Sequence, residues 1–220
     1  MLQKNEEALK NLLEKSYNYA LNGKNAFSMM IEGYQKRDTA LLQEAKELLK
    51  GSKKDESKID MKAVETLALY SPEARDLRRV VALIKVVAEF SRINDYIKSK
   101  INSVIEEIVN DEALEEEGTR LAFFKSTLKA LSDAVELVKE DNSSRLNQLI
   151  RDISIEESKC DDFVAILEKN IILNICENSD EMENFAKRLV NVRKLERVSD
   201  RCMNIAKLMK YAVEGGKLKL

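Results

Sequence analysis

The chain has 220 residues, of which 44% are hydrophobic and 35% charged, and it contains only six glycines and one proline. So few turn-forming residues exclude all-β, collagen-like and disordered chains. The formal net charge of -2 provides no basic excess for binding nucleic acid. Histidine is absent, which removes the usual general acid-base side chain and the commonest nitrogen ligand of transition metals.

Apolar residues recur at helical spacing along almost the whole chain, as at Leu9, Leu12 and Leu13 and again at Val80 and Leu83. This spacing predicts six long helices, over residues 4–36, 39–70, 72–109, 112–140, 144–177 and 180–214. Packed antiparallel in threes, they make an all-α protein of two tandem three-helix bundles. We expect residues 1–110 to form the first bundle and residues 111–220 the second.

Breaks between the predicted helices carry recognisable end signals. Asp38 is of a type that caps a helix, and Ser71 is an N-cap followed by Pro72 at the first helical position. Gly215 and Gly216 stop the last helix. Polar turn clusters mark the remaining breaks, at residues 110–111, 141–144 and 178–180.

The two halves of the chain share two motifs. Asp-Glu-Ser-Lys-Ile-Asp at residues 55–60 returns as Glu-Glu-Ser-Lys-Cys-Asp at residues 156–161. Ser-Arg-Ile-Asn-Asp at residues 91–95 corresponds to Glu-Arg-Val-Ser-Asp at residues 196–200. The motifs fall on the second and third helix of each half with nearly equal separation, which indicates a tandem repeat.

Pairs of acidic residues four apart lie in these motifs, and on a helix each pair projects from one face. They are Glu56 with Asp60, Glu157 with Asp161, and Glu196 with Asp200. Asn204 adds an amide oxygen one turn beyond Asp200. Ligands that are all oxygen favour Mg, Mn, Ca or oxidised Fe. The alternative is a structural salt-bridge network, because Arg193 and Arg197 lie close to the last pair.

The three cysteines, Cys160, Cys176 and Cys202, form no Cys-x-x-Cys pair and are typical of a reducing compartment. Cys160 and Cys202 lie beside the acidic motifs but are expected to be core residues rather than metal ligands. Charged residues interrupt every apolar run, so the sequence predicts neither an export signal nor a membrane-spanning segment.

At these residues the sequence resembles the PhoU family. Its repeat contains a Pro-x-Ala-x-Asp-Leu-Arg segment, which residues 72–78 match fully. It also contains a Glu-Arg-Ile-Gly-Asp helix segment with Asn one turn further on, which residues 196–204 match closely. The resemblance covers both repeats, over about residues 10–214. The first repeat departs from the pattern, because Ser91 stands in place of Glu and Ser99 in place of Asn.

The resemblance implies a six-helix protein of two three-helix bundles, commonly dimeric, that binds metal clusters on its carboxylate motifs. The metal is expected to be Fe, Mn, Mg or Zn. The ligands it implies are Glu157, Asp161, Glu196, Asp200 and Asn204 in the second repeat, and Glu56, Asp60 and Asp95 in the first. Because Ser91 and Ser99 leave Asp95 as the only ligand of the family type on its helix, we expect the first site to be weakened or lost.

By the same resemblance, the chain is a cytoplasmic adaptor rather than an enzyme, which restrains a phosphate ABC transporter and reports phosphate sufficiency to a membrane sensor kinase. A second hypothesis, a ferritin-like di-iron enzyme, is disfavoured because Glu-x-x-His motifs need histidine. A third is a PhoU-related structural bundle that serves another transporter without a functional metal cluster.

Overall fold

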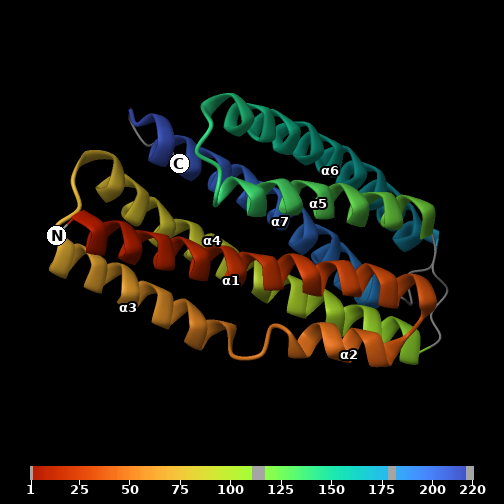
Figure 1. Cartoon of the computed structure of the whole chain (residues 1–220). Helices are drawn as coiled ribbons and strands as arrows, with labels where there is room; N and C mark the ends of the chain where they lie inside the picture. The colour runs from red at the N-terminus through yellow and green to blue at the C-terminus, as the bar shows by residue number, and fades with distance from the viewer. Residues whose placement is uncertain (1, 111–116, 178–181, 217–220) are drawn as a thin grey trace.

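The computed structural model describes residues 2–110, 117–177 and 182–216, and in these residues it contains seven helices and no strand (Figure 1). The predicted all-α helical bundle is confirmed. The helices are α1 (Leu2–Lys36), α2 (Thr39–Glu47), α3 (Ser52–Tyr70), α4 (Ala74–Val109), α5 (Glu117–Leu137), α6 (Ser143–Glu177) and α7 (Met182–Glu214).

The helices pack in two groups that follow the order of the chain. Helices α1 to α4 contact one another, with α2 and α3 placed end to end along α1, and α5, α6 and α7 contact one another (Figure 1). Contacts of α4 with α7 and of α1 with α5 join the groups. One hydrophobic core includes buried residues of both groups, such as Phe90 and Phe123. The division at residues 110 and 111 stays a prediction.

The apolar positions that indicated helices form this core. Leu12, Val80 and Leu83 are fully buried, and Leu9 and Leu13 are partly buried beside them. Since burying one large aliphatic side chain contributes about 1.5–3 kcal/mol, the shared apolar seam is the main stabilising feature of the fold. Cys160 and Cys202 are also buried in the core, as expected.

The predicted helix over residues 39–70 is interrupted, which corrects the expected number of helices. Helix α2 ends at Glu47, and Gly51 adopts a left-handed conformation with φ of 75° before α3 begins at Ser52. Glycine tolerates this conformation because it has no Cβ, so the chain leaves α2 here and resumes as α3 along the same neighbour. The apolar residues keep their helical spacing across the break, so their pattern alone predicts one continuous helix.

Ser71 is not the N-cap of α4, which corrects a second prediction. Helix α4 starts at Ala74, and the extended residue before it is Glu73, which makes no side-chain capping bond. Ser71 instead has φ of 44° and closes α3. An N-cap residue is normally extended, and Ser71 cannot take that conformation while it ends the preceding helix.

Other predicted helix ends are confirmed. The Asp38 carboxylate accepts hydrogen bonds from the backbone N–H groups of Ala40 and Leu41 at 2.9 and 3.1 Å. Asn142 caps α6 in the same way, through the N–H groups of residues 144 and 145. Gly215, with φ of 78°, follows the end of α7. The break predicted at residues 178–180 lies outside the described residues, as do the predicted starts at residues 112 and 180.

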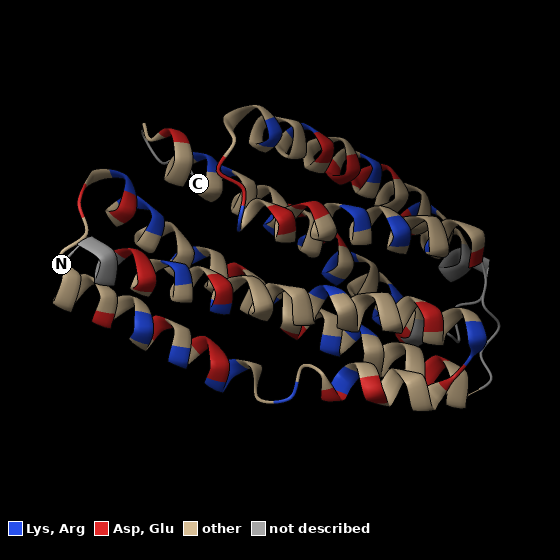
Figure 2. Cartoon of the chain, viewed as in Figure 1, with Lys and Arg blue, Asp and Glu red and all other residues tan. Residues whose placement is uncertain are grey.

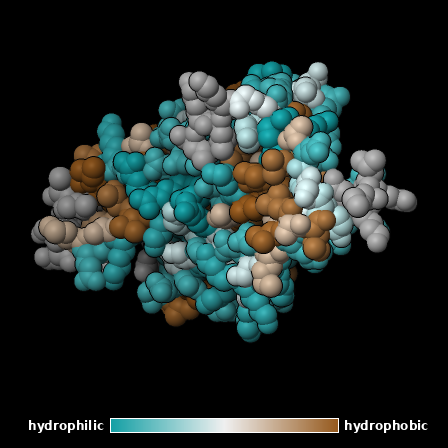
Figure 3. All heavy atoms as spheres, turned by 90° about the vertical axis from the view of Figure 1, so that its left-hand side faces the viewer, coloured by the Kyte–Doolittle hydropathy of each residue, from teal (hydrophilic) through white to brown (hydrophobic). Residues whose placement is uncertain are grey.

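Basic and acidic residues are both distributed along the helices (Figure 2). On the face that holds the N-terminus and the α3–α4 connection, hydrophobic areas alternate with hydrophilic ones (Figure 3). No helix in the described part of the chain is long and apolar enough to cross a membrane.

Candidate metal centre

Helices α6 and α7 bring three carboxylates together. Glu157 and Asp161 lie one turn apart on α6, and Asp200 faces them from α7. One oxygen atom of each carboxylate lies within 4.8 Å of the oxygen atoms of the other two. Asp161 and Asp200 are exposed and Glu157 is half-buried, so a cation from solvent reaches all three. Oxygen ligands in this number are those that a hard cation prefers.

The electrostatics of this group favour a positive charge. Partial burial raises the pKa of Glu157, and the charges of Asp161 and Asp200 raise it further. Burial also raises the pKa of Asp161 and of Asp200, and the charge of Glu196 adds to both increases. Nearby basic side chains oppose these increases, but among the described residues none forms a salt bridge with the three carboxylates. A cation between them would relieve their mutual repulsion.

Two other predicted ligands of the second repeat lie outside this group. Arg193 pairs with Glu196, with Nη1 3.1 Å from Oε2, and it also pairs with Glu168 of α6. Glu196 thus makes an ion pair of the kind that the salt-bridge alternative expects. Asn204 is half-buried on α7, one turn beyond Asp200, and is not part of the cluster of three carboxylates.

In the first repeat a lysine lies among the predicted ligands. Lys53 Nζ lies 3.1 Å from Asp95 Oδ2, 3.6 Å from Glu56 Oε2 and 2.8 Å from Ser91 Oγ, to which it donates a hydrogen bond. The Ser91 hydroxyl in turn donates to Glu56. Burial alone lowers the pKa of Lys53, but the hydrogen bond and charge of Asp95 and the charge of Glu56 outweigh it and raise this pKa.

Asp60, the last predicted ligand of the first repeat, has no ion-pair partner among the described residues. Its Oδ1 atom is buried without a hydrogen bond. Burial raises the pKa of this carboxyl, and the charge of Glu56 raises it further. Asp60 and Glu56 therefore share a face of α3, as their spacing predicts, but only Glu56 is engaged by Lys53.

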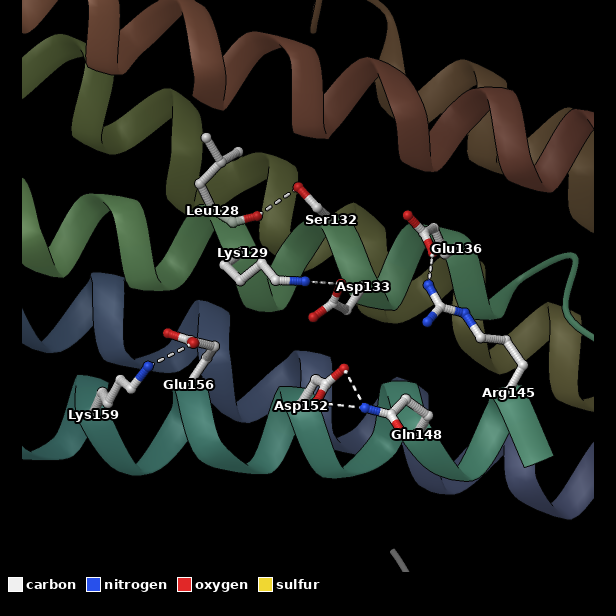
Figure 4. A network of polar contacts seen from close by, with 10 residues as sticks. All are labelled: Leu128, Lys129, Ser132, Asp133, Glu136, Arg145, Gln148, Asp152, Glu156 and Lys159. Carbon is white, nitrogen blue, oxygen red and sulfur yellow. Dashed lines mark hydrogen bonds and ion pairs between the residues drawn. The ribbon is translucent and has the colours of Figure 1, made fainter. Parts of the chain in front are cut away.

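Sequence reasoning missed an acid inside the second repeat. Asp133 of α5 is 2% exposed, and its hydrogen bond comes from Lys129 one turn earlier (Figure 4). Burial raises the pKa of Asp133 despite Lys129, and Asp152 of α6 adds to the increase. The available signal was an acidic residue among the apolar residues Ala130, Leu131, Ala134 and Val135.

A second missed feature is a buried charge cluster where the two groups of helices meet. Lys100 and Glu107 of α4 and Arg120 of α5 line a cavity of about 30 Å³, which α6 and α7 close on the other side. Lys100 Nζ lies 3.7 Å from Glu107 Oε1, and Arg120 pairs with the other carboxylate oxygen. Desolvation lowers the pKa of Lys100 to about 8. The sequence could have indicated this cluster, because Lys100 lies on the same apolar helix stripe as Ile97 and Val104.

Known proteins are similar to this chain over most of its length. The PhoU domain family model matches residues 19–104. The phosphate-specific transport system accessory protein PhoU of Edwardsiella tarda is 28% identical over 162 residues, which are 71% of this chain and 63% of that protein. The chain therefore matches less than two thirds of that relative's length. The PhoU homologue of Pseudomonas aeruginosa is 27% identical over 214 residues, 94% of this chain and 80% of that protein.

Two solved structures share the fold. The crystal structure of PhoU from P. aeruginosa superimposes with a TM-score of 0.75, at 21% identity over 98% of each chain. The phosphate transport system regulatory protein PhoU from Streptococcus pneumoniae gives a TM-score of 0.80, at 19% identity over 98% of this chain and 99% of that one. The domain match over residues 19–104, the curated relatives and the shared helical architecture agree that this chain is similar to proteins of the PhoU family.

Proposed function

We propose that this protein is a cytoplasmic, metal-binding regulator of phosphate uptake and of phosphate-starvation signalling. In this role it is an adaptor, without catalysis of its own, between a phosphate ABC transporter and its sensor kinase. Relatives named as accessory proteins of phosphate-specific transport support the transport role. The sensor kinase, the cytoplasmic location and a homodimer follow from the family resemblance and stay predictions.

The observation that carries the metal part of the proposal is the group of Glu157, Asp161 and Asp200. Its oxygen atoms come from two helices, lie within 4.8 Å of one another and have no salt-bridge partner in the described chain. These residues would hold Fe, Mn, Mg or Zn, with Glu196 and Asn204 as further ligands on α7. A bound cation would supply positive charge that offsets the repulsion between α6 and α7. Metal occupancy would thereby stabilise the packing of the second repeat.

Metal content should depend on two of these carboxylates. In protein purified without chelators or histidine tags, we expect bound metal by mass spectrometry in the wild type and loss of most of it in Asp161→Asn/Asp200→Asn. The isosteric amides keep shape but remove two charges. A chelator should also lower the melting temperature of the wild type and leave the variant unchanged. The matched control is Glu136→Gln/Asp152→Asn, which alters two acids outside the cluster. Equal metal content in all three proteins would exclude this site.

The adaptor role predicts physical contact with the transport system. From phosphate-replete cells, the protein should co-purify with cytoplasmic components of the phosphate transporter and with the sensor kinase. Deletion of its gene should raise phosphate uptake under the same conditions, because restraint is lost. Repeated purifications without either partner, together with unchanged uptake in the deletion strain, would contradict the proposal.

A second candidate function is a PhoU-related adaptor for another transporter that works without a functional metal cluster. Two observations favour it. Arg193 already binds Glu196, and Lys53 already lies among the first-repeat acids. Protein that contains no metal after growth in metal-replete medium, but still co-purifies with a transporter, would select this candidate.

A further inference from the structure

The two repeats differ in chemistry at corresponding positions around their acidic motifs. Glu56, Asp60 and Asp95 of the first repeat correspond to Glu157, Asp161 and Asp200 of the second. All three carboxylates are thus retained in the first repeat, on α3 and α4, as their counterparts are on α6 and α7. Serine at positions 91 and 99 therefore leaves in place the three negative charges that would attract a cation.

Lys53 is the decisive difference. Its counterpart in the second repeat is Ser154, and the counterpart of Ser91 is Glu196. The first repeat has therefore gained an ammonium and lost a carboxylate, relative to the second. Both substitutions meet at one point, because Lys53 Nζ donates to Ser91 Oγ at 2.8 Å. A glutamate in place of Ser91 would add a third carboxylate around the same ammonium.

The contacts of Lys53 resemble the ligation of a cation. Its Nζ has an oxygen of Asp95 at 3.1 Å, an oxygen of Glu56 at 3.6 Å and the Ser91 hydroxyl at 2.8 Å, so α3 and α4 contribute on both sides. An ammonium has three donors and no acceptor, which suits three oxygen partners. Lys98, whose counterpart is Met203, adds a second ammonium 4.0 Å from Asp95.

We propose that the Lys53 ammonium takes the cation position of the first-repeat motif, so that this chain binds metal at the second repeat alone. The claim that the second repeat binds metal rests on the proposed site of α6 and α7, whereas the role of Lys53 does not depend on that site. A tethered ammonium repels an incoming cation and already engages two of the ligands that the cation would need. The ammonium then compensates the charges of Glu56 and Asp95 in the first repeat, whereas the second repeat depends on metal supply.

The test grafts second-repeat chemistry onto the first repeat. In an Asp161→Asn/Asp200→Asn background, which silences the second repeat, Lys53→Ser/Ser91→Glu should create a site for Mn²⁺. We expect Mn²⁺ binding, measured by isothermal titration and by electron paramagnetic resonance, to tighten roughly tenfold or more over the background protein. Asp60→Asn added to this protein should abolish the gain, which locates the new ion.

A control separates a local site from general attraction by negative charge. Lys62→Ser/Ser28→Glu makes the same change in net charge, at a surface ion pair and an exposed position of α1, and should give no gain in Mn²⁺ binding. Circular dichroism verifies that each protein is folded. If the grafted protein does not fold, Lys53→Gln in the same background keeps Ser91 and the side-chain stem, and should still give a smaller gain.

The results distinguish failure of this inference from failure of the proposed function. A folded graft that binds Mn²⁺ no better than its background would overturn the inference. So would a background protein that still binds Mn²⁺ and loses it on Asp60→Asn, because the native first repeat would then take metal beside Lys53. A wild type with no second-repeat metal would contradict the proposed function, while the graft would still decide the role of Lys53.

Discussion

Replacement of Glu107 by glutamine should lower the free energy of unfolding by about 3–5 kcal/mol, the usual cost of removing one partner from a buried ion pair. Glu107 is the acid that lies between Lys100 and Arg120, and the side chains of all three are at most 13% exposed. Burial raises the pKa of Glu107, but the charges of Lys100 and Arg120 outweigh it and keep the carboxyl ionised. The amide would leave two buried cations without their shared anion.

Chemical denaturation followed by circular dichroism measures this loss. The matched control is Glu65→Gln on α3, which removes the same charge from an exposed pair with Lys62. That variant should change stability by less than about 1 kcal/mol, because water screens surface pairs. Equal effects of the two substitutions would show that the charge cluster of Lys100, Glu107 and Arg120 contributes no more to stability than a surface pair.

Stability should also rise with pH between about pH 7.5 and about pH 9.5, by about 2 kcal/mol from Lys100 alone. Desolvation lowers the pKa of Lys100 from 10.5 to about 8 in the folded protein. Between these two pKa values, Lys100 holds a proton in the unfolded chain that it has lost in the folded protein. The free energy of unfolding therefore increases as the pH rises. Below about pH 8 the cost of burying the charged lysine is present in full.

The comparison is wild type against Lys100→Met, which keeps the length of the side chain and removes the titrating group. The variant should lack the rise in the free energy of unfolding that is attributed to Lys100. Measurements end at about pH 9.5 because burial raises the pKa of Tyr19 and of Tyr34, whose ionisation at higher pH favours unfolding. Parallel pH profiles for both proteins would exclude Lys100 as the source.

The sequence predicted most helix positions because their signals are local. Asp38 and Asn142 cap helices through hydrogen bonds within three residues, and apolar spacing fixes which face of each helix is buried. Gly51 and Ser71 were misread because a left-handed residue ends a helix without disturbing the apolar pattern around it.

For the candidate metal centre as well, part of the arrangement follows from the sequence and part from helix packing. The spacing of Glu157 and Asp161 determined that both share one face of a helix, and the repeat identified Asp200 as their counterpart on the next helix. Only packing of α6 against α7 decided that these three carboxylates converge while Glu196 turns to Arg193. Long side chains choose their partners from whatever the neighbouring helix presents, and a single sequence does not give that register.

Tertiary structure alone also decided the two lysine clusters. By itself the sequence determined the all-α class, the repeat and the set of acidic residues, because these follow from periodicity and spacing. It did not indicate that Lys53 of α3 would reach Asp95 of α4, or that Glu107 of α4 and Arg120 of α5 would surround Lys100. Charged side chains are expected at the surface, and their burial depends on partners that long-range packing brings within reach.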